Sequence, residues 1–125
     1  IVVKNYPLTE KYCKEKLTLL NEAISKLQES LGEVDQTFKE IETYRKMRKF
    51  SEKKSDMAIW LNLETVEFLR SIIQPKPDDK DTPLEELADV LILAFDACNL
   101  YGIGNWKEVK KIIDAKMKKN YKKKY

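Results

Sequence analysis

The sequence predicts an all-α protein. Its 125 residues include only three glycines and four prolines, and these fall between long uninterrupted stretches. Apolar residues recur at three- and four-residue intervals, which is typical of one face of an amphipathic helix. The segment 82–85, Thr-Pro-Leu-Glu, places a capping residue, a proline and an acid where a helix begins. We therefore expect a bundle of about four to five helices in a single domain spanning residues 1–125.

The first part of the chain predicts two helices. After Pro7, one apolar stripe marks an N-terminal helical extension at about residues 8–32, which we expect to end near Gly32. A second helix continues the spacing, followed by a polar loop over residues 48–56 in which Ser55 or Asp56 caps the next helix. The apolar stripe consists of Leu17, Leu20, Ile24, Leu27 and Leu31, and the second helix carries Phe38, Ile41 and Tyr44.

The remaining helices are marked by their ends. Residues 57–73 are nearly continuously apolar, so we expect a largely buried helix that ends before Pro75, which lacks an amide donor. The next helix starts at Thr82, includes LEELADVLILAFDACNLYG and stops near Gly102. A last amphipathic helix starts at about Trp106, and its apolar side carries Val109, Ile112, Ile113 and Met117.

Composition narrows the possible functions. No apolar run approaches the roughly 20 residues that span a bilayer, and IVVKNYPL at the N-terminus does not resemble a signal peptide. We expect a cytoplasmic protein without membrane contact. Cys13 and Cys98 are far apart and histidine is absent, which argues against a zinc site and a Cys-His nucleophile and favours two reduced thiols. Acid–base chemistry and metal binding then fall to carboxylates, lysines and water, and oxygen ligands select magnesium, manganese or calcium.

Charge is unevenly distributed. Nine lysines follow Trp106 against two acids, so this tail carries +7 and the preceding body −4, within a net charge of +3. A basic segment can bind nucleic acid, a membrane surface or nucleotide phosphates, and charge alone does not choose among them.

Two pairs of carboxylates lie in the two most apolar predicted helices. Glu64 and Glu67 are three residues apart, as are Glu86 and Asp89, so each pair projects from one helix face. If these helices pack antiparallel, the four carboxylates converge and can hold metal ions. The alternative is that these acids are solvated or pair with lysines, and spacing alone favours neither interpretation. Asp96 either joins the same face, takes part in a polar network or reaches solvent.

Three motifs in order carry a family resemblance. They are Glu64-x-x-Glu67, then Glu86-x-x-Asp89 within EELADV, then Lys116-x-x-x-Asn120 within KMKKN. This set resembles the all-alpha nucleoside triphosphate pyrophosphohydrolase superfamily, which includes MazG-like proteins, dimeric dUTPases and dCTP pyrophosphatases, and it covers about residues 38–125. Two positions depart from the pattern: Leu63 stands where many members have a second glutamate, and Lys123 where an arginine is common, which keeps the charge but loses bidentate geometry.

The resemblance implies a reaction. Members hydrolyse a ribo- or deoxyribonucleoside triphosphate to the monophosphate and pyrophosphate. The resemblance also implies a housecleaning role, in which unwanted nucleotides are removed before a polymerase uses them. The implied cofactor is Mg²⁺, with Mn²⁺ as a substitute, held by Glu64, Glu67, Glu86 and Asp89. The first motif also supplies the group that orients or deprotonates the attacking water, for which we favour Glu67 over Glu64.

Candidate substrate contacts lie elsewhere on the chain. Lys116, Asn120 and Lys123 share one helical face and can present two cations and an amide to a triphosphate. A solvated lysine-rich helix is the alternative, and the resemblance favours phosphate contact for Lys116 and Asn120. Trp60, one turn before the first motif, is a candidate for stacking on the base, although core packing is the favoured role for any single aromatic residue. Other candidates are Tyr101 and Trp106, and weaker ones are Tyr44, Asn62 and Arg70.

The apolar helix faces exceed what a thin monomer covers, so we expect a homodimer or homotetramer that completes the core. The competing interpretation is a non-enzymatic helical interaction module whose basic C-terminal tail binds nucleic acid. It accounts for the charge asymmetry but not for the embedded acids, so we do not expect a nucleic-acid partner. The base, the sugar, the acceptance of diphosphates and the choice between dimer and tetramer stay open at this point.

Overall fold

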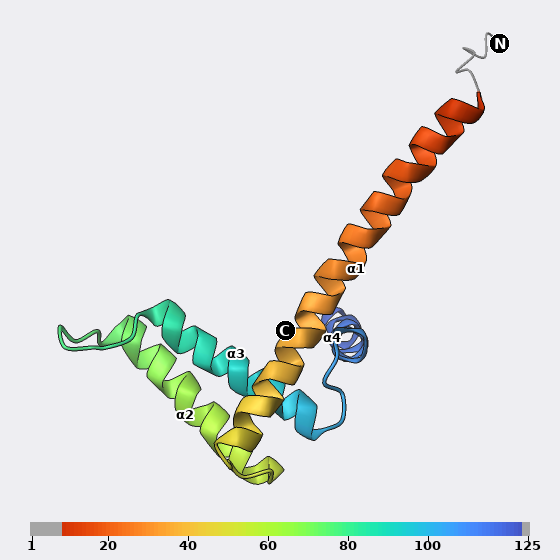
Figure 1. Cartoon of the computed structure of the whole chain (residues 1–125). Helices are drawn as coiled ribbons and strands as arrows, with labels where there is room; N and C mark the ends of the chain where they lie inside the picture. The colour runs from red at the N-terminus through yellow and green to blue at the C-terminus, as the bar shows by residue number, and fades with distance from the viewer. Residues whose placement is uncertain (1–8, 124–125) are drawn as a thin grey trace. The chain divides into compact units, whose positions relative to one another are not determined.

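The structure is a computed structural model that describes residues 9–123. Residues 1–8, on which the signal-peptide prediction and the predicted start of the first helix fall, lie outside the described residues, as do residues 124–125 and the side chain of Leu31. The described residues form four helices and no strand, so the all-α prediction is confirmed (Figure 1). The helices are α1 (Glu10–Met47), α2 (Lys54–Ile73), α3 (Pro83–Leu100) and α4 (Trp106–Tyr121). None of them is long and apolar enough to cross a membrane.

The chain divides into two compact units. The first ends at Glu33 and the second begins at Val34. In the first unit, the described residues are Thr9 and the N-terminal part of α1. The second unit contains the remainder of α1 together with α2, α3 and α4, and it holds every candidate site residue named above.

Helix α1 corrects the prediction of two helices separated near Gly32, because it is one helix from Glu10 to Met47. A single glycine inside a helix costs only about 1 kcal/mol relative to alanine, so it does not have to end one. In the turn after Met47, Lys49 adopts a left-handed conformation with φ 55°. The amide of Phe50 donates to the carbonyl of Arg45, and the amide of Lys49 to that of Lys46, which is a Schellman ending.

The start of α2 also differs from the prediction. Neither Ser55 nor Asp56 is its N-cap; Lys53 occupies that position without a side-chain cap. The Ser51 hydroxyl instead accepts from the Lys53 amide at 3.1 Å and donates to the Asp56 carboxylate at 2.6 Å. A serine before the helix and an acid in its first turn thus stabilise this end jointly.

Helix α2 was expected to be largely buried, and in the second unit it is not. Only Met57 and Ser71 are buried along it. The helix contacts α3 along one side, and the two form an antiparallel hairpin (Figure 1). Six apolar side chains of α2 are each more than half exposed: Ile59, Leu63, Val66, Leu69, Ile72 and Ile73. Apolar composition predicts a preference for burial but does not supply the surface that covers the residue.

The remaining predicted helix ends are confirmed. Pro75 follows the end of α2, and Thr82 and Glu85 form a reciprocal capping box at the start of α3. Gly102 takes φ 76° just after α3, a conformation that glycine adopts without steric cost. Helix α4 begins at Trp106, capped by the side chain of Asn105. The Trp106 amide also donates to the Asp35 carboxylate of α1 at 2.8 Å.

The most deeply buried apolar side chain among the described residues, Phe38, packs between α1 and α3. Phe38 is fully buried, and its ring lies 4.7 Å from that of Phe95, centroid to centroid. Beside these rings, the Asn99 amide group donates to the Phe38 carbonyl at 2.9 Å. These contacts fix α3, and with it the hairpin, against the second half of α1.

Candidate metal centre

The α2–α3 hairpin brings the four predicted carboxylates together. Glu64 and Glu67 lie about one turn apart on α2, and Glu86 and Asp89 lie about one turn apart on α3. Glu64, Glu67 and Glu86 each offer an oxygen, and these oxygens all lie within 4.8 Å of one another. Acids from two helices therefore face one point, which helix spacing alone did not require.

A fifth carboxylate joins them. Asp81, Glu86 and Asp89 form a second group of oxygens within 4.8 Å of one another, and Glu86 belongs to both groups. The sequence interpretation missed Asp81 because it lies in the loop before α3, outside any helical spacing rule. Its place directly before the capping residue Thr82 was the one available signal, since the cap fixes that loop against the first turn of α3.

Two carboxylate oxygens of this cluster have no hydrogen-bond partner to offset the cost of their burial. Oε2 of Glu64 and Oε2 of Glu86 are buried and have no hydrogen-bond partner. Burying an ionised carboxylate without a partner is costly, because neither water nor a donor replaces its hydration. In this cluster the neighbouring groups are themselves acids, so proximity adds repulsion to that cost.

The pKa values respond to this crowding. Burial, a side-chain hydrogen bond with Glu67 and the nearby charges of Glu67, Asp89 and Glu86 raise the pKa of Glu64 to about 7. The pKa of Glu86 is also raised, first by burial and then by Glu67, Asp81 and Asp89. Burial and the charge of Asp81 likewise raise the pKa of Asp89. At neutral pH the Glu64 carboxyl is therefore protonated in part of the molecules.

One arginine lies near the cluster but is engaged elsewhere. Arg70 of α2 forms an ion pair with Asp79 in the loop between α2 and α3, at 2.8 Å. The charge of Arg70 lowers the pKa of Glu86 but does not outweigh the causes that raise it. The Asp79 carboxylate also accepts from the Lys76 amide at 2.8 Å. Arg70 therefore closes the loop rather than neutralising the cluster, and its weak candidacy for base contact gains no support.

The donor set fits a hard divalent cation. The oxygens are carboxylates from five side chains, and magnesium, manganese and calcium prefer such ligands. The two buried oxygens without partners are the observation that favours a cation over a solvated acidic surface. A divalent ion there would offset both the repulsion and the burial cost.

An open pocket of about 470 Å³ adjoins the carboxylates. Glu64 and Asp89 form part of its wall, and Tyr44 and Phe50 supply aromatic rings. Trp60 does not line the pocket; it packs edge-on against Phe50 at 6.0 Å between ring centroids. The remaining wall residues are Glu40, Ile41, Ile92 and Leu93. The structure therefore places Trp60 outside the pocket wall, against Phe50, and Tyr44, a weaker candidate in the sequence, in that wall.

The other aromatic candidates and the predicted phosphate contacts lie apart from this pocket. Tyr101 borders a separate pocket of about 120 Å³ between the first turns of α2 and the end of α3. Lys116, Asn120 and Lys123 are exposed, and no hydrogen bond or ion pair within residues 9–123 joins them to the carboxylates. Their predicted role in phosphate binding stays a prediction.

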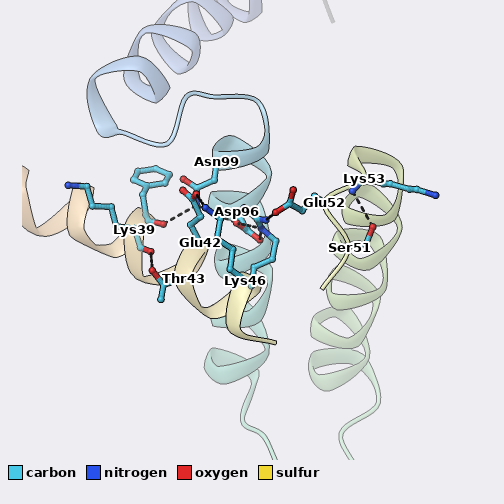
Figure 2. A network of polar contacts seen from close by, with 11 residues as sticks. Lys39, Glu42, Thr43, Lys46, Ser51, Glu52, Lys53, Asp96 and Asn99 are labelled. Carbon is cyan, nitrogen blue, oxygen red and sulfur yellow. Dashed lines mark hydrogen bonds and ion pairs between the residues drawn. The ribbon is translucent and has the colours of Figure 1, made fainter. Parts of the chain in front are cut away.

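Asp96 takes the network role left open by the sequence. Figure 2 shows it with Asn99 on α3, facing polar residues of α1 and Glu52 of the following loop. Asp96 is 3% exposed and accepts from Arg45 Nε at 2.9 Å, and Arg45, 4% exposed, also donates to Glu52 at 2.8 Å. Asp96 belongs to neither group of metal-binding oxygens. Sequence reasoning missed Arg45, whose partner lies 51 residues away.

Comparison with known proteins finds no matching family model, no similar curated protein and no similar solved structure.

Proposed function

We propose that this chain is a Mg²⁺-dependent nucleoside triphosphate pyrophosphohydrolase of the MazG-like kind, cleaving between the α and β phosphates. One observation carries the proposal. Carboxylates of two antiparallel helices meet with two buried oxygens left unpartnered, beside an open pocket with aromatic walls. The order of the three sequence motifs supports the same reaction.

The residues divide into roles in this proposal. Glu64, Glu67, Glu86 and Asp89 hold the divalent ion, with Mn²⁺ as a substitute for Mg²⁺, and Asp81 is an additional ligand. The ion supplies charge neutralisation at phosphate oxygens and a lower pKa for bound water. Glu67 orients or deprotonates the attacking water in preference to Glu64, which is the more deeply placed of the two.

The pocket is the proposed place for the nucleoside. Tyr44 and Phe50 offer rings for a base, and Trp60 packs edge-on against Phe50. Glu40 offers a carboxylate acceptor at the same wall. Lys116, Asn120 and Lys123 remain the proposed contacts for the triphosphate tail, in which two cations and an amide match its charge.

The exposed apolar side of α2 supports the further proposal of a homodimer or homotetramer. Its six half-exposed side chains form a larger apolar surface than a folded monomer usually presents to water. Light scattering tests this proposal directly, because a monomeric mass at micromolar concentration contradicts it.

The test of the activity is a panel of ribo- and deoxynucleoside triphosphates with Mg²⁺, scored for monophosphate and pyrophosphate. We expect both products with Mg²⁺ or Mn²⁺ and neither in EDTA. Glu67→Gln and Asp89→Asn should abolish turnover while the helical circular dichroism spectrum is unchanged. Glu22→Gln, which neutralises an exposed acid of the first unit, is the matched control and should keep full activity. Full activity in both site variants would refute the proposal.

A nucleic-acid-binding interaction module is the alternative function. The observation in its favour is that the lysines of α4 are exposed. That function predicts strongly salt-dependent binding to DNA or RNA without metal-dependent turnover, so the nucleotide panel and a binding titration at two salt concentrations separate the two.

A further inference from the structure

We propose that the first unit pairs with a second copy of this chain as a parallel, two-stranded coiled coil built on the N-terminal part of α1. This inference concerns α1 up to Glu33 and does not depend on the metal centre. Its occupant is a second copy of the same helix, aligned in the same direction and in register.

The apolar residues of this segment follow a heptad repeat. Cys13, Leu17, Leu20, Ile24 and Leu27 are separated by four, three, four and three residues, a mean period of 3.5. That period keeps one seam facing a supercoiled partner, whereas a straight helix of 3.6 residues per turn drifts by about 20° per heptad. We call these five side chains the α1 seam, with Leu17 and Ile24 at a positions and the others at d.

The α1 seam is uncovered in the described unit. Its four aliphatic side chains are all exposed, between 42% and 65%. The face opposite the seam carries Glu15, Glu22 and Glu29, which occupy the f position of three successive heptads. An acidic outer face and an apolar inner one distinguish this helix from a polar, solvated one.

In the second half of α1, an a position of the same heptad repeat meets another helix of the same chain. Phe38 and Ile41 continue the register in the sequence, and in the second unit Phe38 is fully buried against Phe95 of α3. At Phe38, an apolar a position of α1 is therefore used for packing against a facing helix. The first unit contains no such helix among its described residues, and in this proposal a second copy of the chain supplies it.

The flanking positions favour a second copy over a different helix. In a parallel, in-register pair, Lys16 faces Asn21, Ala23 faces Gln28 and Ser30 faces Asp35 of the other copy. No like charges oppose one another in this arrangement. Partner choice between unlike helices is usually specified by charges at these e and g positions, and from residue 21 to residue 30 they are uncharged.

The core residues favour the parallel, two-stranded form. Ile24 occupies an a position between Leu20 and Leu27 at d, and β-branched a residues with leucine at d favour parallel dimers. The segment from Glu10 to Glu33 spans roughly 36 Å at 1.5 Å per residue. This length holds about three heptads, so we expect a dimer that dissociates on dilution rather than a permanent one.

Cys13 provides a direct test of direction and register. It is exposed and lies at a d position, so an aligned parallel pair brings the two Cys13 thiols opposite each other across the seam. An antiparallel pair separates them along most of the helix. The protein for this experiment is the full chain carrying Cys98→Ser, which leaves Cys13 as its only thiol, treated with diamide and analysed on a non-reducing gel.

Two adjacent leucines give a matched pair of variants. Leu19 and Leu20 are each 57% exposed, but only Leu20 belongs to the seam. We expect efficient formation of the Cys13–Cys13 disulfide in the parent and in Leu19→Asp, and at least a tenfold slower reaction in Leu20→Asp. Circular dichroism checks that both variants keep their helices.

Three outcomes contradict the proposal. In the first, the Cys13–Cys13 disulfide of the parent forms no faster in buffer than in 8 M urea, where the protein is unfolded and the seam cannot pair. The second is an equal loss of cross-linking in Leu19→Asp and Leu20→Asp. The third is sedimentation of the reduced parent as a monomer at the concentration used for cross-linking. Because the readout is a thiol reaction in the first unit, these outcomes leave the nucleotide panel as a separate test of the proposed function.

Discussion

Replacing Glu64 by glutamine should make the metal-free protein more stable, and increasingly so as the pH rises. The pKa of Glu64 is raised in the folded protein from 4.5 to about 7. Below pH 4.5 the side chain is protonated in both folded and unfolded states and makes no difference. Between these pH values the folded state binds more protons than the unfolded state, so the free energy of unfolding falls as the pH rises. Above pH 7 the loss is complete.

The size of this effect follows from the shift. Each pH unit between the two pKa values corresponds to about 1.4 kcal/mol, which sets a ceiling of about 3 kcal/mol for Glu64. Solvent around a partly exposed side chain reduces the value that is measured. Glutamine keeps the shape of the side chain and carries no charge, so Glu64→Gln should remove this pH-dependent loss.

Urea unfolding in EDTA at pH 5, 6, 7 and 8, followed by tryptophan fluorescence, measures the difference. We expect Glu64→Gln to exceed the parent by 1 to about 3 kcal/mol at pH 8 and to approach it at pH 5. Glu22→Gln, on the exposed face of α1, should match the parent at every pH. A constant difference between Glu64→Gln and the parent across this range would refute the account of a crowded, buried carboxylate.

Three further predictions concern the cation, the buried ion pair and a helix start. Saturating Mg²⁺ should raise the midpoint of thermal unfolding more at pH 8 than at pH 5.5, because protons compete for the carboxylates; equal shifts at both values would contradict binding at this cluster. Asp96→Ala should lower the free energy of unfolding by about 3 to 5 kcal/mol, because Arg45 is left buried with only Glu52 as an ionic partner. The double variant Arg45→Met/Asp96→Leu should lose less free energy of unfolding, because no buried charge is left unpaired. Thr82→Ala should cost about 1 kcal/mol by removing the capping box of α3, measured by urea unfolding against Thr43→Ala, whose hydroxyl contacts only its own helix.

Local chemistry made parts of the fold readable from the sequence. The start of α3 needs only Thr82, Pro83 and Glu85, which are neighbours in the chain, and the end of α3 needs only Gly102. The predicted loop over residues 48–56 begins directly after Met47, where α1 ends, so this helix end was predicted as well, although the left-handed conformation of Lys49 was not. Gly32, which favours such a conformation, lies inside the helix instead.

In the candidate site, too, the features set by neighbouring residues were predicted and those set by tertiary structure were not. Helical spacing predicted that Glu64 pairs with Glu67 and Glu86 with Asp89, since each pair lies on one helix. Asp81 joins them from a loop, and Arg45 meets Asp96 across the fold, so neither followed from spacing. The exposure of α2 was missed for a related reason: a run of apolar residues gives the driving force for burial, but tertiary or quaternary structure decides what covers it.

The hairpin of α2 and α3 is held differently at its two ends. Near the start of α2, Arg45 joins Asp96 to Glu52 through contacts that depend on no added ion. Towards the turn, the facing surfaces carry acids that repel one another. A cation there would hold α2 and α3 together only at the end near the turn, and chelation would remove it. Chelation should therefore speed hydrogen exchange in the second half of α2 and the first turns of α3. The backbone amides near Arg45 should keep their protection, because the hairpin then opens only at the end near the turn.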